Sequence, residues 1–264
     1  MVSSPDARIL DVTAPGNPAL TEHVSVEAGR RDRQRNEDLA DVERRYSGPE
    51  VGAVRRHMNR VTRRHMRIDG DFLDYGSGGP WWKDEMWAGF ASVTAAEVDR
   101  GALQAIGEAF PDVALWHTAN GLINSGRQFD VVLSSSVVGY IHPDQAAPHL
   151  AGCYQLLKDG GQLVLTRVLA HGLPSALRRR RLVTVENGSF AYHYTRRDLR
   201  GLLADQGFQD IRAVELGIRF PGLPWSFNQT LYKVVPALMG RLLPLLLPFL
   251  RIQHMLVATK PVRP

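Results

Sequence analysis

The chain has little of what a secreted or membrane-spanning protein needs. It has one cysteine, Cys153, so no disulfide can form within it. Residues 1–20 contain Asp6 and Asp11 and lack the basic and then apolar pattern of a signal peptide. The longest apolar run, residues 242–250, falls well short of the roughly 20 residues that a membrane-spanning helix needs. We therefore expect a cytoplasmic protein without a membrane span, although peripheral membrane contact stays open.

Lysine is scarce as well. The net charge is +5, and only four of the 32 basic residues are lysines, so arginine carries nearly all of the positive charge. Arginine favours fixed, forked contacts with phosphate or carboxylate groups. This composition permits an anionic partner without requiring one.

The chain divides into three expected parts. Residues 1–35 show no hydrophobic period and are expected to be disordered. Residues 36–68 are expected to form a helical flank or lid, because 53–68 is arginine-rich with apolar residues at near-helical spacing, namely Val54, Met58, Val61 and Met66. Residues 69–264 are expected to form the main domain. With 264 residues, 44% of them hydrophobic, the chain can bury a large core.

Strand and helix patterns alternate from residue 71 onward. The pattern predicts strands at 72–75, 91–98, 113–116, 129–136 and 161–168, with helices that begin at Pro80 and Arg100 and a third at 143–157. Such alternation indicates an α/β fold, with a parallel sheet covered by helices on both faces. A further helix is expected between Thr195, which can cap it together with Asp198, and Gly207, which ends it. Strands at 209–220 and 252–260 complete the pattern.

The turn after the first predicted strand, in DFLDYGSGGPWW (71–82), is rich in glycine. A glycine turn between a strand and a helix brings backbone amides to the carboxyl edge of a parallel sheet, where nucleotide-like ligands bind. Gly76 and Gly78 are therefore candidate cofactor residues. A dinucleotide fingerprint would require a glycine five residues after Gly76, where the chain has Trp81, so an NAD site is not favoured.

This turn resembles the first motif of the class I S-adenosylmethionine-dependent methyltransferases, in which an acid ends the strand and alternate glycines follow, here Asp74, Gly76 and Gly78. Glu97, 21 residues after Gly76, the segment FDVVLSSSVV and the segment LLKDGGQLVL extend the resemblance, which covers about 70–217 and 252–260. It implies a Rossmann-like sheet of seven strands, mostly parallel, with the last strand antiparallel.

The resemblance also implies S-adenosyl-L-methionine as cofactor and a set of binding residues. Glu97 would accept hydrogen bonds from both ribose hydroxyls, and Asp74 would lie near the methionine portion. The expected cofactor set is Asp74, Gly76, Ser77, Gly78, Glu97, Asn120 and Ser135, with no metal ligand. Two positions depart from the family pattern: Pro80 replaces a third glycine, and the acid that would contact adenine is absent, leaving Asn120 as its nearest polar substitute.

A general base is needed only if the acceptor holds its proton tightly, as an alcohol does. His142, six residues beyond the fourth predicted strand and near Tyr140, is the candidate; a purely structural histidine is the alternative. His193, between Tyr192 and Tyr194, is a second candidate. Trp81 and Trp82 are expected to serve packing.

Two insertions are expected to set the acceptor. The first, about 169–194, contains four consecutive arginines; the second, about 220–251, is apolar and interrupted by prolines at positions 236, 244 and 248. We expect the second insertion to act as a lid over a hydrophobic, lipid-like or secondary-metabolite acceptor, methylated at oxygen. Coverage of the sheet or of a homodimer partner is the alternative.

Two other functions stay open at this level. The arginines of 53–68 allow an RNA methyltransferase or an RNA-binding protein, although no appended RNA-binding motif is present and SSSVVGYI replaces the expected catalytic motif, so nucleic acid is not favoured. The altered adenine position and Pro80 would also suit a methyltransferase fold repurposed for non-methylating chemistry.

Overall fold

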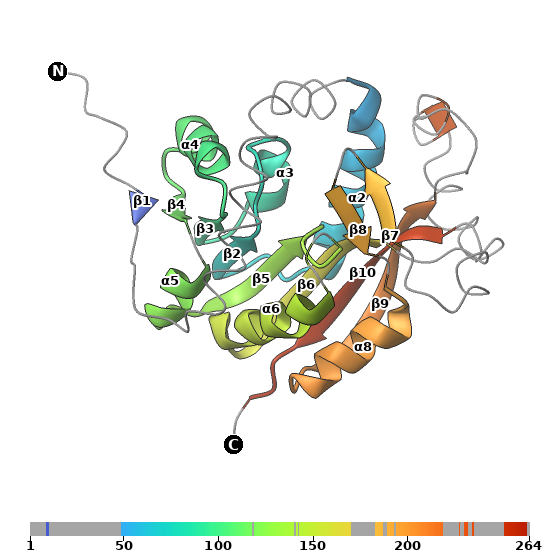
Figure 1. Cartoon of the computed structure of the whole chain (residues 1–264). Helices are drawn as coiled ribbons and strands as arrows, with labels where there is room; N and C mark the ends of the chain where they lie inside the picture. Colours follow the sequence, from blue (N-terminus) through green and yellow to red (C-terminus); the bar gives the residue numbers. More distant parts are fainter. Residues whose placement is uncertain are drawn as a thin grey trace.

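The structure is a computed structural model of the chain. It describes residues 9–10, 49–117, 119–139, 141, 143–169, 183–186, 189–192, 194–218, 227, 230, 231, 234 and 251–262. Helices cover both faces of one sheet, as predicted: α2, α3 and α4 lie above it in Figure 1, and α5, α6 and α8 lie below. The α/β, Rossmann-like prediction is therefore confirmed.

The sheet has the order β1-β4-β3-β2-β5-β6-β10-β9. Its strands are β1 (Ile9–Leu10), β2 (Asp71–Tyr75), β3 (Ser92–Ala96), β4 (Ala114–Trp116), β5 (Phe129–Ser135), β6 (Leu157–Leu169), β9 (Gln209–Ile218) and β10 (Arg251–Thr259). Strands β4, β3, β2, β5 and β6 pair in parallel, and β10 is antiparallel to both β6 and β9. The predicted seven-stranded sheet with one antiparallel strand is thus present, and β1 adds two residues at its edge.

The helices are α2 (Pro49–His65), α3 (Lys83–Trp87), α4 (Arg100–Ala109), α5 (Ala119–Asn124), α6 (Pro143–Leu156) and α8 (Arg196–Asp205). A separate hairpin pairs β7 (Val183–Glu186) with β8 (Ser189–Tyr192) inside the first insertion. Among the described residues, no helix combines the length and the apolar character needed to cross a bilayer.

Each face of the sheet buries its own hydrophobic core. Side chains alternate along a strand, so Leu73 of β2 packs with α5, α6 and α8, whereas Phe72 packs with α2, α3 and α4. Met58 of α2 and Met66, the residue just after α2, pack into the second core, as their spacing predicted. The C-terminal end of α2 is tied to β6, because the Gln162 side chain accepts from Arg67 N at 2.9 Å and donates to His65 O at 3.4 Å. Helix α2 is a packed flank of the domain.

Local signals explain the ends of α8. The Thr195 side chain accepts from Asp198 N, the Asp198 carboxylate accepts from Thr195 N, and Gly207 adopts φ +89° after the helix. This reciprocal cap satisfies two amides that a helix start leaves without partners. Both the predicted start and the predicted stop are confirmed.

The structure differs from the sequence predictions at several points. Strand β6 begins at Leu157, four residues before the predicted start at 161. The helix expected from Pro80 begins at Lys83, because Trp82 before it has the left-handed φ of 65°, which cannot continue inside a right-handed helix. Ile9 and Leu10 form an edge strand in a segment expected to be disordered; apart from them, residues 1–35 lie outside the described residues.

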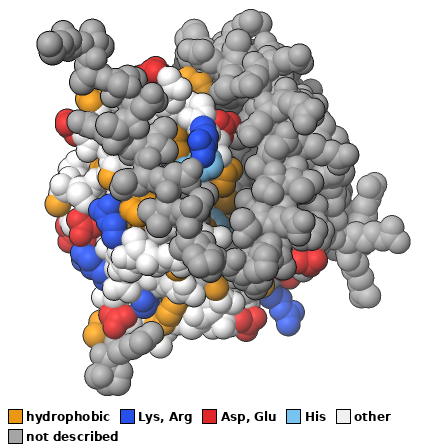
Figure 2. Space-filling view, turned by 60° about the vertical axis from the view of Figure 1, so that its left-hand side comes forward, with side chains coloured by type: hydrophobic (Ala, Val, Ile, Leu, Met, Phe, Trp, Pro, Cys, Tyr) orange, Lys and Arg blue, Asp and Glu red, His pale blue; other side chains and the backbone are white. Residues whose placement is uncertain are grey.

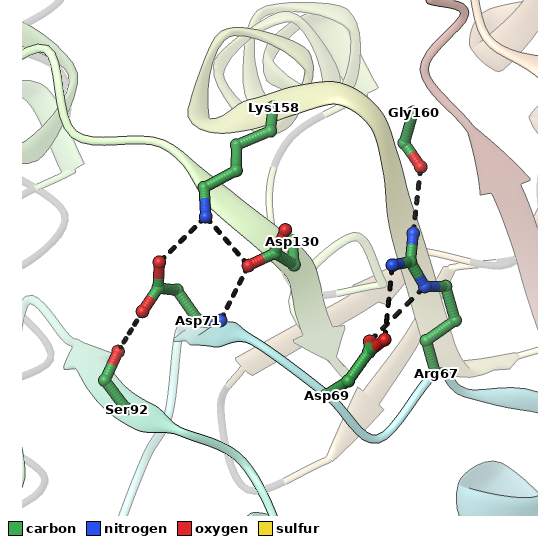
Figure 3. Close-up of polar contacts among 7 residues, drawn as sticks. All are labelled: Arg67, Asp69, Asp71, Ser92, Asp130, Lys158 and Gly160. Carbon is green, nitrogen blue, oxygen red and sulfur yellow. Dashed lines mark hydrogen bonds and ion pairs between the residues drawn. The ribbon is translucent and has the colours of Figure 1, made fainter.

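The amino ends of the strands are held by an ion cluster (Figure 3). Lys158 Nζ lies 2.8 Å from both Asp71 Oδ2 and Asp130 Oδ2, and Asp130 Oδ2 also accepts from Asp71 N. Ser92 Oγ donates to Asp71 Oδ1 at 2.6 Å. The hydrogen bond from Lys158 lowers the pKa of Asp71, which keeps it ionised at neutral pH. This edge therefore joins β2, β3 and β5, and the opposite, carboxyl edge is left for a ligand.

Candidate functional site

The glycine turn after β2 lies against the end of β3. Gly76 N and Ser77 N both donate to Ala96 O, at 2.8 and 3.1 Å. Gly76 and Gly78 adopt left-handed φ values of 76° and 63°, which glycine reaches without steric cost. The backbone of the turn is thus bonded to the sheet and presented at its carboxyl edge.

The two glycines face different surroundings. A Cβ on Gly76 would overlap Val137 Cγ2 in the segment after β5, whereas a Cβ on Gly78 would have no heavy atom within 4 Å. Gly76 is therefore required by close packing. Gly78 borders open space, where a ligand can approach the bare backbone.

Glu97 follows β3 and is held by backbone amides. Its Oε2 accepts from Gly78 N at 2.7 Å, and its Oε1 accepts from Val98 N at 2.9 Å and Asp99 N at 3.2 Å. Only 8% of the residue is exposed. A carboxylate has about four acceptor positions, so three amides fix its orientation and leave capacity for a further donor such as a hydroxyl. The hydrogen bond from Gly78 N thus fixes the Glu97 carboxylate against the glycine turn.

Asp74 is almost fully buried, with 1% exposure, and its two carboxylate oxygens differ in their hydrogen-bond partners. Oδ2 accepts from Lys83 Nζ at 2.6 Å and from Trp87 Nε1 at 3.0 Å. Lys83 and Trp87 lie one turn apart on α3, so both reach the same oxygen. Oδ1 is buried without a hydrogen-bond partner, and Ser77 Oγ is in the same state. Buried polar atoms without partners are rare and point to a missing donor or acceptor.

Sequence reasoning missed three residues of this site. Lys83 and Trp87 bind Asp74, and the only advance signal was their four-residue spacing after the turn, together with the rarity of lysine. Val98, next to Glu97, is an apolar side chain that is 45% exposed at this edge. An exposed valine beside a buried carboxylate suits contact with a flat apolar ligand surface.

Asn120 and Ser135 lie at the same edge of the sheet. Ser135 is the last residue of β5, which pairs with β2, and Asn120 lies in α5, directly after β4. Asn120 is exposed and Ser135 is partly buried. The structure therefore brings Asp74, Gly76, Ser77, Gly78 and Glu97 together. It places Ser135 at the end of β5 and Asn120 after β4.

The predicted catalytic candidates fall outside the described residues. This applies to His142, Tyr140 and His193, and to most of the two insertions, with the β7–β8 hairpin as the described part of the first. The general-base role of His142 therefore stays a prediction.

A buried polar cluster supports the site from the opposite face of the sheet. His149 of α6 contacts Ser134 Oγ at 3.0 Å and lies against the Tyr75 ring, with centroids 4.6 Å apart. Burial lowers the pKa of His149 to about 4, so it is neutral at pH 7. Tyr75 and Ser134 are the chain neighbours of Asp74 and Ser135. The cluster thus fixes the strand ends that carry the site.

Comparison with known families gives one decisive match. Residues 32–213, more than half of the chain, match the model of a family described as a methyltransferase domain. The chain belongs to the class I S-adenosylmethionine-dependent methyltransferase family. A comparison with curated protein sequences finds no match.

Several solved methyltransferases share this fold. The 1,6-didemethyltoxoflavin-N1-methyltransferase of Burkholderia thailandensis, bound to 1,6-didemethyltoxoflavin and S-adenosylhomocysteine, is 15% identical, with a TM-score of 0.60 over 96% of this chain and 92% of that one. The DhpI-SAM-HEP complex is 16% identical, with a TM-score of 0.56 over 96% of this chain and 100% of that one. A Haemonchus contortus phosphoethanolamine N-methyltransferase 2 was solved with phosphomonomethylethanolamine and S-adenosylhomocysteine. It is 15% identical, with a TM-score of 0.52 over 84% of this chain and 60% of that one.

The residues of this methyltransferase fit its cofactor. Glu97 can take ribose hydroxyls, Gly78 leaves open space beside the turn, and the buried Asp74 Oδ1 and Ser77 Oγ have no partners of their own. S-adenosylmethionine is a cofactor rich in hydroxyl and charged groups that match such atoms. The altered Pro80 position does not disrupt the turn, because Pro80 lies before α3 and outside the helix.

Proposed function

We propose that the protein transfers the methyl group of S-adenosylmethionine to a small organic acceptor bound at the carboxyl edge of the sheet. The observation that carries this proposal is the buried Glu97 carboxylate, which three backbone amides hold in place beside the open space at Gly78. A carboxylate that is already oriented to accept hydrogen bonds, next to a backbone without side chains, suits the ribose of the cofactor and the methionine portion attached to it.

The protein's own part in such a reaction is positioning. When bound, the cofactor supplies an activated methyl group on a sulfonium. Glu97 would hold the ribose, and the 76–78 turn with Asp74 would hold the methionine end. Correct alignment of acceptor and donor can supply about 7–11 kcal/mol of the acceleration.

We propose oxygen as the methylated atom. His142 would take the proton that an alcohol holds tightly, and the apolar second insertion would favour a hydrophobic acceptor. Nitrogen is the second candidate, because two similar structures are those of enzymes named as N-methyltransferases. Product analysis by mass spectrometry separates an O-methyl from an N-methyl product.

The arginines of segment 53–68 favour a small acceptor over RNA. Arg63 Nη1 donates to Met86 O at 3.1 Å, Arg67 Nη1 donates to Gly160 O at 3.2 Å, and Arg56 lies 5.6 Å from the ring centroid of Trp82. At least three of the six arginines in 53–68 thus make contacts within the protein. Where its side chains are described, the face in Figure 2 shows acidic and apolar side chains among the basic ones.

Cofactor binding tests the proposal. We expect Glu97→Ala to weaken S-adenosylmethionine binding by about 1.5–3 kcal/mol, the usual value for hydrogen bonds to a charged group. Glu108→Ala is the matched control, because Glu108 is an exposed carboxylate on α4. Calorimetric titration gives both affinities. Absence of binding by the unmodified protein at millimolar concentration, or equal affinities for the two variants, would contradict the assignment.

The acceptor class is tested with labelled cofactor. We expect label from methyl-labelled S-adenosylmethionine to enter the small-molecule fraction of a cell extract. A label that stays with RNA, and is released by ribonuclease, would support the RNA methyltransferase alternative. Cofactor binding without labelling of any fraction would point to the repurposed fold.

A further inference from the structure

We propose that Lys83 completes the subsite for the α-amino-acid end of the cofactor: its Nζ donates to the carboxylate, while Asp74, which the resemblance already places at the methionine end, accepts from the ammonium through Oδ1. This inference rests on the proposed function and assigns a ligand-binding role to Lys83, which the sequence resemblance did not include.

The geometry of Asp74 supplies the acceptor. Both described donors, Lys83 Nζ and Trp87 Nε1, bind the same oxygen, Oδ2. They fix the carboxylate plane from α3 and leave Oδ1 buried without a partner. A buried carboxylate oxygen strongly favours a donor, since leaving it unpaired is costly. An ammonium group is the strongest such donor, because its bond to a carboxylate is charge-assisted.

Lys83 supplies the complementary cation. An ammonium has three N–H donors, of which Asp74 takes one. The Lys83 side chain is only 11% exposed, and its Nζ lies 5.4 Å from the ring centroid of Trp87. The lysine is thus held close to Asp74 at the start of α3, just after the glycine turn. Its remaining donors suit a carboxylate that enters beside that turn.

The charges of the pair match a zwitterion. Asp74 and Lys83 form a neutral pair at 2.6 Å, so a ligand end that carries one positive and one negative group keeps the buried site neutral. A ligand end with only an ammonium would bring a second positive charge toward Lys83. The pair therefore selects for a complete α-amino acid and against a simple amine.

The test compares two ligands that differ only in this carboxylate, S-adenosylmethionine and decarboxylated S-adenosylmethionine. We expect the unmodified protein to bind the first about 10- to 100-fold more tightly, as for one charge-assisted hydrogen bond. Lys83→Met should bring this ratio close to one, and Lys83→Arg should retain most of it. 5′-Methylthioadenosine lacks the amino-acid end and should bind the unmodified protein and Lys83→Met equally.

Lys158→Met is the matched control, because Lys158 also pairs with carboxylates but lies at the amino edge of the sheet. It should leave the ligand ratio unchanged. Equal affinity of the unmodified protein for both ligands would overturn the proposal, as would a uniform loss for all three ligands in Lys83→Met. Should Lys83→Met fail to fold by circular dichroism, the ratios of the unmodified protein and of Lys83→Arg decide. Failure of the unmodified protein to bind any of the ligands would instead overturn the proposed function.

Discussion

Alanine substitutions at Gly76 and Gly78 should separate packing from ligand binding in one turn. Both residues have left-handed φ values, so alanine costs about 1–2 kcal/mol at either position. About 0.4–1 kcal/mol of this is offset, because alanine has less freedom than glycine in the unfolded chain. We therefore expect a backbone cost of about 1 kcal/mol in the free energy of unfolding for each variant.

The surroundings then make the two variants differ. At Gly76 the new methyl overlaps Val137 Cγ2, which adds an overpacking cost of about 1–3 kcal/mol. At Gly78 no heavy atom lies within 4 Å, so stability should fall by the backbone cost alone. The Gly78 methyl would instead enter the proposed cofactor space, and S-adenosylhomocysteine should bind about tenfold more weakly or worse.

Urea unfolding and calorimetric titration give the two quantities. Adding Val137→Ala to Gly76→Ala removes the atoms that collide, so the double variant should be more stable than the sum of the single effects predicts. Two results would refute the reasoning: a Gly78→Ala protein that binds S-adenosylhomocysteine as tightly as the unmodified one, or a stability loss at Gly78 as large as at Gly76.

Two further predictions concern histidines. The pKa of His149 in the folded protein, about 4, lies below its ordinary value of 6.5, so between these pH values the unfolded chain binds a proton that the folded protein does not. Stability should fall from pH 6.5 toward pH 4 by up to about 3 kcal/mol through this residue, and urea unfolding of His149→Gln across that range should lack this component. His142→Ala should lower turnover by about 10²–10⁴-fold with unchanged S-adenosylmethionine affinity, if a base removes the acceptor proton; unchanged turnover would leave His142 a structural residue.

Local signals in the sequence were sufficient for much of the fold. The cap of α8 was predictable because Thr195, Asp198 and Gly207 act on backbone groups within their own helix. The glycine turn was predictable from its position between a strand and a helix, and Glu97 from its resemblance to the family's acid at the end of the second strand. The position of Glu97 beside Gly78 then follows from the pairing of β2 with β3.

Contacts between distant segments were not predictable in the same way. The bonds of Lys83 and Trp87 to Asp74 depend on where α3 begins, and the left-handed Trp82 moved that start beyond Pro80. The cluster of His149 with Ser134 and Tyr75 joins three elements across a layer of the fold. The spacing of residues along the sequence does not predict such packing, because the packing is set by how the helices lie on the sheet.

The place of β10 in the sheet constrains the order in which the protein can be completed during synthesis. Strand β9 is paired with β10, and β10 alone joins it to β6, yet β10 is the last of the described strands to leave the ribosome. Until residues 251–259 emerge, the nascent chain holds two unpaired strand edges, at β6 and β9. Such edges invite pairing with other chains, so the period before β10 inserts is when this enzyme most needs protection from aggregation.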